Sequence, residues 1–228
     1  MLLPNEKAIT FSYDDGVLQD FRLVELFNKY GIKATFNINS ELLGTEGALT
    51  IQGKTIQHNK ISRSDVAPLY KGHEVASHTL THPHLTYLPD EEIVRQVERD
   101  RENLSRLVGY EVVGMAYPGG GFQNSDRVEN VIRRYTGVRY ARTISLAYSF
   151  NSQENIFRYK PTAFHMDFDV NYRLADEFFA MEGGGLFYIW GHSYEFDVDN
   201  TWDKLEEFLR YISHRPDIKY ITNKEALL

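Results

Sequence analysis

The sequence predicts a single α/β domain, built as a closed or nearly closed barrel of parallel strands with helices on the outside. Short strand-like segments alternate with amphipathic stretches along the chain of 228 residues, and this alternation is typical of parallel sheets. Barrels of roughly 200–250 residues are common single domains. A doubly wound open sheet is the second interpretation. A dinucleotide fold is disfavoured, because no G-x-G-x-x-G motif follows the first predicted strand.

The first 60 residues contain the first strand–helix–strand unit and a polar insert. We predict strands at 7–13 and 33–39, with a helix at 18–30 between them, where apolar residues recur at nearly helical spacing. Gly31 follows that helix, at the position where helices favour a left-handed residue. The polar insert at 41–60 contains the segment LTIQGKTIQ, which predicts a small hairpin.

The middle of the chain repeats the pattern. A helix is predicted at 62–71 and ends before Gly72, and a strand follows at 73–77. The segment 89–108 is the clearest helix, because its apolar residues line one face and charges cover the other. The next strand, at 112–117, ends at Pro118 and three glycines. A glycine triplet of this kind is weak evidence for phosphate binding.

The last third continues the alternation. The segment LFYIW at 186–190 is apolar throughout, as expected for a parallel strand buried on both faces. The remaining predicted elements are helices at 125–135, 171–182 and 201–214 and strands at 138–142, 159–164 and 219–222.

Composition excludes several classes of protein. The chain has no cysteine, which removes disulfides, thiolate catalysis and cysteine-type zinc sites, so that any metal must be bound by His, Asp or Glu. The net charge of −7 argues against a nucleic-acid partner. The sequence contains no run of 18 apolar residues, which is the length that would predict a membrane span. The first residues show no basic stretch followed by an apolar one, so we expect the cytoplasm.

Acidic and imidazole side chains gather where the predicted strands end. Asp14 and Asp15 follow the first strand, His78 and His82 follow the strand at 73–77, and His192 follows the strand at 186–190. In a parallel barrel the carboxyl ends of the strands meet on one face, and that face carries the active site. We therefore predict one site built from these residues.

The adjacent carboxylates Asp14 and Asp15 predict two different roles. Neighbouring carboxylates repel each other unless a cation neutralises them, and successive residues point in different directions. One of them can bind a metal ion while the other faces the substrate water. The alternative is an aspartate that caps the next helix, which explains one carboxylate and not both.

His78 and His82 have metal-ligand spacing. They are four residues apart, which would place both imidazoles on one face of a helical turn. The alternative is a histidine-rich loop, since His73 and His84 are also near. Together with Asp15 they would form a site of two imidazoles and one carboxylate, which leaves positions for water and substrate and is typical of catalytic metal centres.

His192 ends the most apolar predicted strand, in the segment WGHSYEF. It could be a third imidazole ligand or a general acid. Because Asp15, His78 and His82 already complete a metal triad, we favour the general acid.

Four motifs in this order resemble those of one family. FSYDDG, SHTLTH, AYPGG and FYIWGH are similar to the motifs of the NodB-type polysaccharide deacetylases, carbohydrate esterase family 4, and their order and spacing cover residues 8–192. The resemblance implies a single catalytic domain over residues 1–228 with a distorted (β/α) barrel of the NodB type. It also implies removal of acetyl groups, usually from N-acetylated amino sugars, with a divalent metal.

The resemblance also assigns roles to residues. Asp14 matches the general base and Asp15 the metal-binding aspartate of the family, while His78 and His82 match the two metal-binding imidazoles. His192 matches the general acid.

The resemblance extends to the loop that follows the strand at 112–117. The loop after Tyr117 and Pro118 matches the one whose backbone N–H helps to form the oxyanion hole, which indicates Gly119 and places Tyr117 among the substrate-binding candidates.

Two family features are replaced in this chain. The arginine that steadies the base in many members is Ala116 here, and Arg142, at the end of the next predicted strand, is a candidate substitute. The Asp-Trp motif that usually precedes the last catalytic strand is not evident, and His165 or Asp167 is a candidate to orient His192. The family's usual secretion signal is not evident either, which weakens the expectation of a cell-wall substrate.

These observations predict a metal-dependent hydrolase that removes acetyl groups from N-acetylated oligo- or polysaccharides. The expected cofactor is one divalent ion, Zn²⁺ first, with Co²⁺, Ni²⁺ or Mn²⁺ as alternatives. Two other hypotheses stay open. The same site could hydrolyse another amide, an O-acetyl or an N-formyl group, or the chain could be a non-catalytic protein that binds metal or carbohydrate. Retention of both Asp14 and His192 argues against the last hypothesis.

Overall fold

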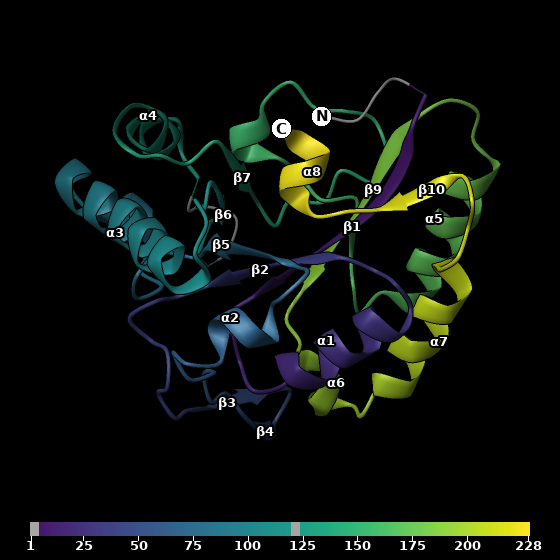
Figure 1. Ribbon diagram of the computed structural model, residues 1–228, viewed down its shortest axis with the longest axis horizontal. Helices are drawn as coiled ribbons and strands as arrows, with labels where there is room; N and C mark the ends of the chain where they lie inside the picture. The colour runs from purple at the N-terminus through teal and green to yellow at the C-terminus, as the bar shows by residue number, and fades with distance from the viewer. Residues whose placement is uncertain (1–4, 120–123) are drawn as a thin grey trace.

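The computed structural model describes residues 5–119 and 124–228 and contains a curled, parallel eight-stranded sheet (Figure 1). The strand order is β7-β6-β5-β2-β1-β9-β8, and β10 pairs with β1 beside this path. The strands are β1 (Lys7–Asp14), β2 (Ala34–Ile38), β5 (Glu74–Ser77), β6 (Gly114–Ala116), β7 (Tyr140–Arg142), β8 (Ala163–Phe164), β9 (Gly185–Gly191) and β10 (Ile218–Tyr220).

The two edges of the sheet approach each other. A parallel bridge joins Arg142 at the end of β7 to Tyr159, in the segment that leads into β8, and β8 pairs with β9. The sheet therefore curls into a barrel, and the predicted fold class, a distorted (β/α) barrel with outer helices, is confirmed.

Helices follow most strands and cover the outside of the sheet (Figure 1). The prediction of an amphipathic helix at 89–108 is confirmed almost to the residue by α3 (Asp90–Val108). The predicted hairpin in the polar insert is also present, as β3 (Ala48–Ile51) and β4 (Lys54–Gln57). The other helices are α1 (Asp20–Lys29), α2 (Val66–Leu69), α4 (Asp126–Tyr135), α5 (Phe168–Ala180), α6 (Glu195–Val198), α7 (Trp202–Ile212) and α8 (Asn223–Leu227).

Strand β1 has two chemically different faces. Ile9, Phe11 and Tyr13 belong to the largest apolar cluster, together with buried residues of α1, α5 and α7. Thr10 and Ser12 are buried and alternate with them. Because successive side chains of a strand point to opposite faces, these polar residues face the barrel interior, as Asp14 does.

The amino ends of the strands are closed by the last helix. Thr10 Oγ1 donates to Asn223 Oδ1 at 2.9 Å, and Lys224 N donates to Glu74 Oε2 at 2.8 Å. Glu74 also accepts from Thr35 Oγ1 and from the Tyr140 hydroxyl, both at 2.9 Å. This end of the barrel is therefore a buried polar floor, and the opposite, carboxyl end is where Asp14 lies.

Two local predictions were wrong. The helix expected at 62–71 is only α2, four residues long. The segment from His78 to His82 is not a helical turn but an irregular loop after β5, in which Thr79 and His82 have positive φ angles of 69° and 58°. The spacing of the two histidines therefore has a different structural basis from the one that we inferred.

Candidate active site

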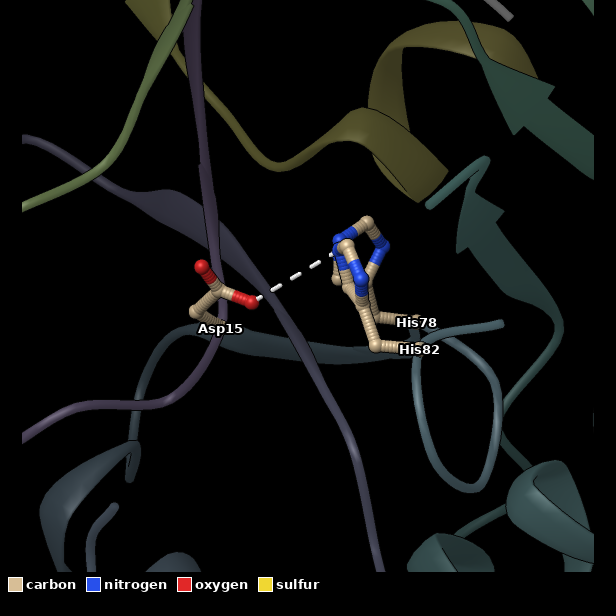
Figure 2. Close-up of side chains that lie close together, drawn as sticks. All are labelled: Asp15, His78 and His82. Carbon is tan, nitrogen blue, oxygen red and sulfur yellow. Dashed lines mark ion pairs between the residues drawn. The ribbon is translucent and has the colours of Figure 1, made fainter. Parts of the chain in front are cut away.

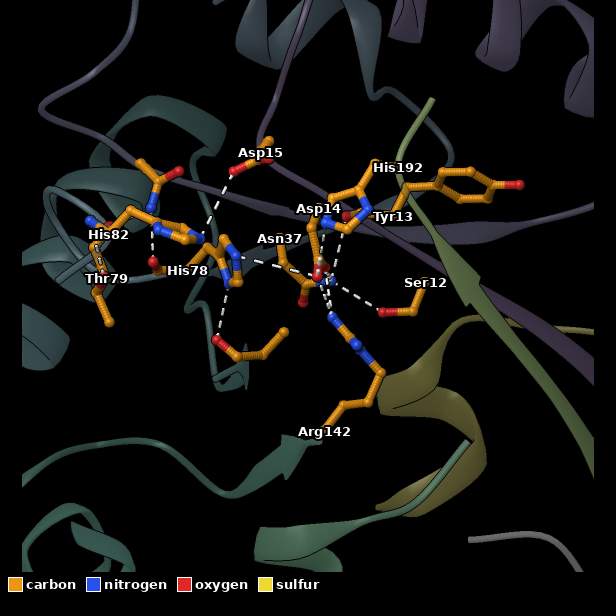
Figure 3. Close-up of polar contacts among 12 residues, drawn as sticks. Ser12, Tyr13, Asp14, Asp15, Asn37, His78, Thr79, His82, Arg142 and His192 are labelled. Atoms are coloured by element: carbon orange, nitrogen blue, oxygen red, sulfur yellow. Dashed lines mark hydrogen bonds and ion pairs between the residues drawn. The ribbon is translucent and has the colours of Figure 1, made fainter. Parts of the chain in front are cut away.

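The carboxyl ends of β1, β5, β7 and β9 bring the predicted carboxylates and imidazoles together (Figure 3). Asp14 is the last residue of β1, and its Oδ2 lies 4.0 Å from Nε2 of His78 and 4.0 Å from Nε2 of His192. One carboxylate thus stands between two imidazoles that come from strands on either side of it. This is the convergence that parallel strands produce at their carboxyl ends.

Asp14 is buried and accepts three hydrogen bonds from two donor groups. Nη2 of Arg142 lies 2.5 Å from both carboxylate oxygens, and Nδ2 of Asn37 donates to Oδ1 at 2.8 Å. Burial alone would raise the pKa of Asp14, but the charges of Arg142, His78 and His192 lower it overall. The contact that we expected between Arg142 and Asp14 is present, and it keeps this carboxylate ionised.

Asp15, His78 and His82 form a candidate metal-binding group (Figure 2). Their potential ligand atoms all lie within 4.8 Å of one another, and Nε2 of His82 is 3.9 Å from Oδ1 of Asp15. Ligand atoms that share one ion at about 2.1 Å in a tetrahedral or facial arrangement lie roughly 3.0–3.5 Å apart, so side-chain rotations of about 1 Å would bring the three groups onto an ion. The donor set therefore fits a divalent ion.

His78 has the tautomer that a ligand needs. Its Nδ1 lies 2.9 Å from the carbonyl oxygen of Ala116. A carbonyl accepts, so Nδ1 carries the hydrogen and Nε2 is left with a free lone pair. Burial also lowers the pKa of His78 to about 4, so the imidazole is neutral near pH 7.

Buried side chains hold the strained loop of the two histidines. Oδ2 of Asp100 accepts from Ser77 Oγ at 2.5 Å and from His78 N at 3.2 Å. Nδ2 of Asn39 donates to the carbonyls of His78 and Thr79 at 2.6 and 2.9 Å. These bonds replace those of a helix and fix the imidazoles, which explains how the left-handed residues of this loop are tolerated.

His192 is oriented by a residue that the sequence analysis missed. Oε2 of Glu195 lies 3.2 Å from His192 Nδ1 and 2.6 Å from His165 Nε2. The hydroxyl of Tyr13 lies 3.2 Å from His165 Nδ1. We expected His165 or Asp167 to orient His192: His165 reaches it indirectly, through a shared contact with Glu195, and Asp167 is the residue before α5. Glu195 lies in the motif WGHSYEF, three residues after His192, and this spacing was the available signal.

Glu195 changes the protonation of His192. Burial by itself would lower the pKa of His192, but the hydrogen bond and the charge of Glu195 raise it to about 9. The pKa of Glu195 is itself lowered by both histidines. His192 therefore carries a proton on Nε2 at neutral pH, on the side that faces Asp14.

Tyr117 and Gly119 lie in the loop after β6. The side chain of Tyr117 is buried in an apolar cluster, and its hydroxyl donates to the carbonyl of Phe157 at 3.0 Å. Any part that Tyr117 plays in binding substrate would therefore fall to its backbone, because the hydroxyl is already used. Gly119 has a left-handed φ of 73°. Gly120 and Gly121 of the predicted glycine triplet lie outside the described residues.

The carboxylate Asp15 has two further neighbours that the sequence did not predict. Nε2 of His58 lies 3.3 Å from its Oδ2, and Nζ of Lys60 lies 3.3 Å from its Oδ1. Both come from the end of the polar insert, beyond the hairpin, where the sequence offers no recognisable motif.

The fold and the site together place this chain among the parallel (β/α)-barrel proteins that carry a candidate metal centre at the carboxyl ends of their strands. Within this class, the family model described as polysaccharide deacetylase matches residues 3–141, and the chain belongs to this family. The family resemblance noted in the sequence is therefore confirmed. Among residues 5–119 and 124–228, no helix is long and apolar enough to cross a membrane.

The chain is similar to characterised proteins in sequence and in fold. It is 25% identical over 126 residues to the peptidoglycan-N-acetylmuramic acid deacetylase PdaC of Bacillus subtilis. The matched segment covers 54% of this chain and 24% of PdaC. The chain thus spans about a quarter of that relative's length.

Two solved structures show the same fold. The Xyl-CE4 domain of a multidomain xylanase from the hindgut metagenome of Trinervitermes trinervoides matches with a TM-score of 0.59 at 19% identity, over 97% of this chain and 89% of that domain. BA3943 of Bacillus anthracis, described as a pseudoenzyme, matches with a TM-score of 0.56 at 15% identity, over 98% of this chain and 66% of that one.

Proposed function

We propose that this protein is a metal-dependent hydrolase that removes acetyl groups from N-acetylated sugars. One observation carries the proposal. The candidate metal ligands lie at the same end of the barrel as a separate carboxylate, Asp14, and a separate imidazole, His192. Asp14 lies 4.0 Å from the ligand His78 and 4.0 Å from His192. Amide hydrolysis requires a base for water and an acid for the leaving amine, and a carboxylate kept ionised beside an imidazole kept protonated meets both needs.

The proposed cofactor is one divalent ion held by Asp15, His78 and His82. Two imidazoles and one carboxylate suit Zn²⁺ first, and Co²⁺, Ni²⁺ and Mn²⁺ after it. When bound, such an ion would polarise the acetamide carbonyl and make the attacking water more acidic.

Asp14 is the proposed general base. Arg142 and Asn37 orient its carboxylate, and its lowered pKa keeps it ionised through the neutral range. It accepts the proton of the attacking water, and Arg142 keeps the carboxylate ionised and oriented until that transfer. Arg142 thereby takes the place of the arginine that the motif lacks.

His192 is the proposed general acid. Its Nδ1 is bonded to Glu195, so that Nε2–H is the atom that can reach the leaving nitrogen. Protonation of that nitrogen lets the amine depart. The N–H of Gly119 remains our proposal for an oxyanion donor, because the chain turns there with a positive φ.

The proposed substrates are acetylated carbohydrates. We propose N-acetylated oligo- or polysaccharides, with peptidoglycan fragments that carry N-acetylmuramic acid as one candidate because of the similarity to PdaC. A related amide, O-acetyl or N-formyl group is the second candidate, since the same base and acid would serve. One catalytic domain over residues 1–228 and a cytoplasmic location stay predictions.

A metal analysis coupled to an acetate-release assay tests the proposal. We expect the purified protein to retain close to one divalent ion per chain and to release acetate from short N-acetylglucosamine oligomers or from peptidoglycan fragments. His78→Ala should lose both the ion and the activity. The matched control is His214→Asn, because His214 is exposed and Asn tolerates its positive φ of 59°. A wild-type protein that binds the ion but releases no acyl group from any acetylated or formylated sugar would support the non-catalytic alternative, for which a fold relative described as a pseudoenzyme provides precedent.

A further inference from the structure

A buried lysine lies against the proposed metal ligand Asp15. Lys60 is 7% exposed, although lysine is among the residues that are least often buried. Its Nζ donates to the backbone carbonyl of Asp15 at 2.8 Å and lies 3.3 Å from the carboxylate oxygen Oδ1. The ammonium group is thus fixed to both the main chain and the side chain of this residue.

The backbone holds Lys60 in this position. Lys60 forms an antiparallel bridge with Val17, just after the end of β1. Leu18 N donates to the carbonyl of Asn59 at 2.9 Å, and Ile61 N donates to that of Gly16 at 3.0 Å. The segment that carries Lys60 is therefore bound to the segment that carries Asp15, and the side chain does not depend on a surface rotamer to reach its partner.

The two oxygens of Asp15 have different partners. Oδ2 lies 3.3 Å from His58 Nε2, whereas Oδ1 lies 3.3 Å from Lys60 Nζ and 3.9 Å from His82 Nε2. Because Oδ1 is the oxygen nearest to His82, it is the oxygen that a shared ion would bind. Lys60 occupies the same oxygen.

We propose that Lys60 is a built-in competitor for the metal ion. Its ammonium neutralises Asp15 when no ion is bound, which stabilises the metal-free protein. A divalent ion that binds Oδ1 must displace this interaction and remain close to a positive charge that is itself buried, so Lys60 weakens metal binding. The inference rests on the proposed metal site at Asp15, His78 and His82, and it concerns the strength of that site.

The proposal predicts two effects of opposite sign for Lys60→Gln. Glutamine removes the charge but keeps an N–H donor for the carbonyl of Asp15. Zinc affinity should rise, on the order of ten- to hundredfold, because a like charge is removed from the ion's surroundings. The melting temperature of the metal-free protein should fall, because Asp15 is left without its cation. A residue that acted only as a structural support would lower both quantities.

The test is a zinc titration of the metal-free full chain by calorimetry in the presence of a competing chelator, together with thermal unfolding with and without zinc. Lys60→Arg keeps the charge and should bind zinc within about threefold of the wild type, whereas Lys60→Met loses charge and donor and should bind zinc more tightly than the wild type. Lys54→Gln is the matched control. Lys54 lies in the same insert as Lys60 and forms an exposed ion pair with Asp199, so the substitution removes the same charge at a different place.

The outcomes separate the two proposals. Tighter zinc binding by Lys60→Gln and Lys60→Met, but not by Lys54→Gln, supports the inference. Unchanged or weaker binding by both Lys60 variants overturns it while leaving the metal site intact. A folded wild type that binds no zinc, or whose binding survives Asp15→Asn, overturns the metal site itself and the inference with it.

Discussion

The two ends of the barrel each bury a carboxylate, and they treat it in opposite ways. At the carboxyl end, Asp14 is paired with the guanidinium of Arg142, and its pKa is lowered despite burial. At the amino end, burial raises the pKa of Glu74, because its partners Thr35, Tyr140 and the Lys224 amide are neutral donors. Neutral donors satisfy the hydrogen-bonding needs of Glu74, whereas the fixed positive charge of Arg142 also favours the ionised form of Asp14. The difference separates a group suited to accept protons from one that holds the floor together.

The largest expected effect concerns activity. Asp14→Asn should reduce the rate of acetate release by roughly 10²–10⁴-fold, the usual contribution of a general base, while zinc remains bound. Glu74→Gln, the corresponding change at the other end, should alter the rate by less than about threefold, since Glu74 is bonded to the floor and not to the site. Steady-state rates and zinc content of both variants provide the measurement. Loss of zinc in Asp14→Asn would show that the roles of Asp14 and Asp15 were assigned the wrong way round.

The next effect concerns stability and the acid limb of the pH profile. Arg142→Met leaves Asp14 buried without its hydrogen-bonded counter-charge and with the protonated His192 nearby at 4.0 Å, and such changes cost about 3–5 kcal/mol of unfolding free energy. Tyr140→Phe removes one neutral donor from Glu74 and should cost only about 1–3 kcal/mol. Urea unfolding measures both values, and equal losses would break the comparison.

The surviving activity of Arg142→Met carries a second signature. Arg142 lowers the pKa of Asp14, so its removal should move the acid limb of kcat/KM to higher pH. An acid limb that stayed in place would separate Asp14 from the base role.

A smaller effect sharpens the contrast within the site itself. Glu195 raises the pKa of His192 to about 9, so a general acid at His192 should give the wild type an alkaline limb near that pH. Glu195→Gln removes the negative partner, and the limb should move toward lower pH by a unit or more, on the order of the usual effect of a neighbouring charge. The pH dependence of kcat/KM provides the measurement. A control is His165→Gln, which keeps Glu195 and should shift the limb less.

The smallest effect is a pH dependence of stability at the floor. The pKa of Glu74 is raised in the folded state, so the folded protein binds the proton more tightly than the unfolded chain. The stability that this provides is fully present below the ordinary glutamate pKa and is lost as pH rises through the raised value. Glu74→Gln should abolish this component, so its unfolding free energy should fall less than that of the wild type as pH rises from below the ordinary glutamate pKa to neutrality. Identical pH slopes for both proteins would show that Glu74 has the same pKa in the folded and unfolded states.

The order of strands and helices, and the strand ends at which reactive residues lie, could be predicted from the sequence alone. The alternation of apolar and polar residues in β1, the continuous apolar run of β9 and the apolar face of α3 are local patterns, which are present in the chain before it folds. Because parallel strands align their carboxyl ends, the positions of Asp14, Asp15, His78 and His192 predicted a common site without any knowledge of loops.

The side chains that contact these site residues depend on the tertiary fold. Arg142 is separated from Asp14 by 128 positions and Lys60 from Asp15 by 45, and neither contact leaves a periodic signal in the sequence. Likewise, the partner of His192 is Glu195 and not Asp167, because the short helix α6 that follows β9 begins at Glu195 and places its carboxylate beside His192. Periodicity fixes which face of an element is buried, but contacts between distant loops depend on how the whole sheet curls. For that reason the chemistry, and Arg142 as a candidate partner of Asp14, could be predicted from the chain, whereas the charges of Lys60 and Glu195 beside the site could not.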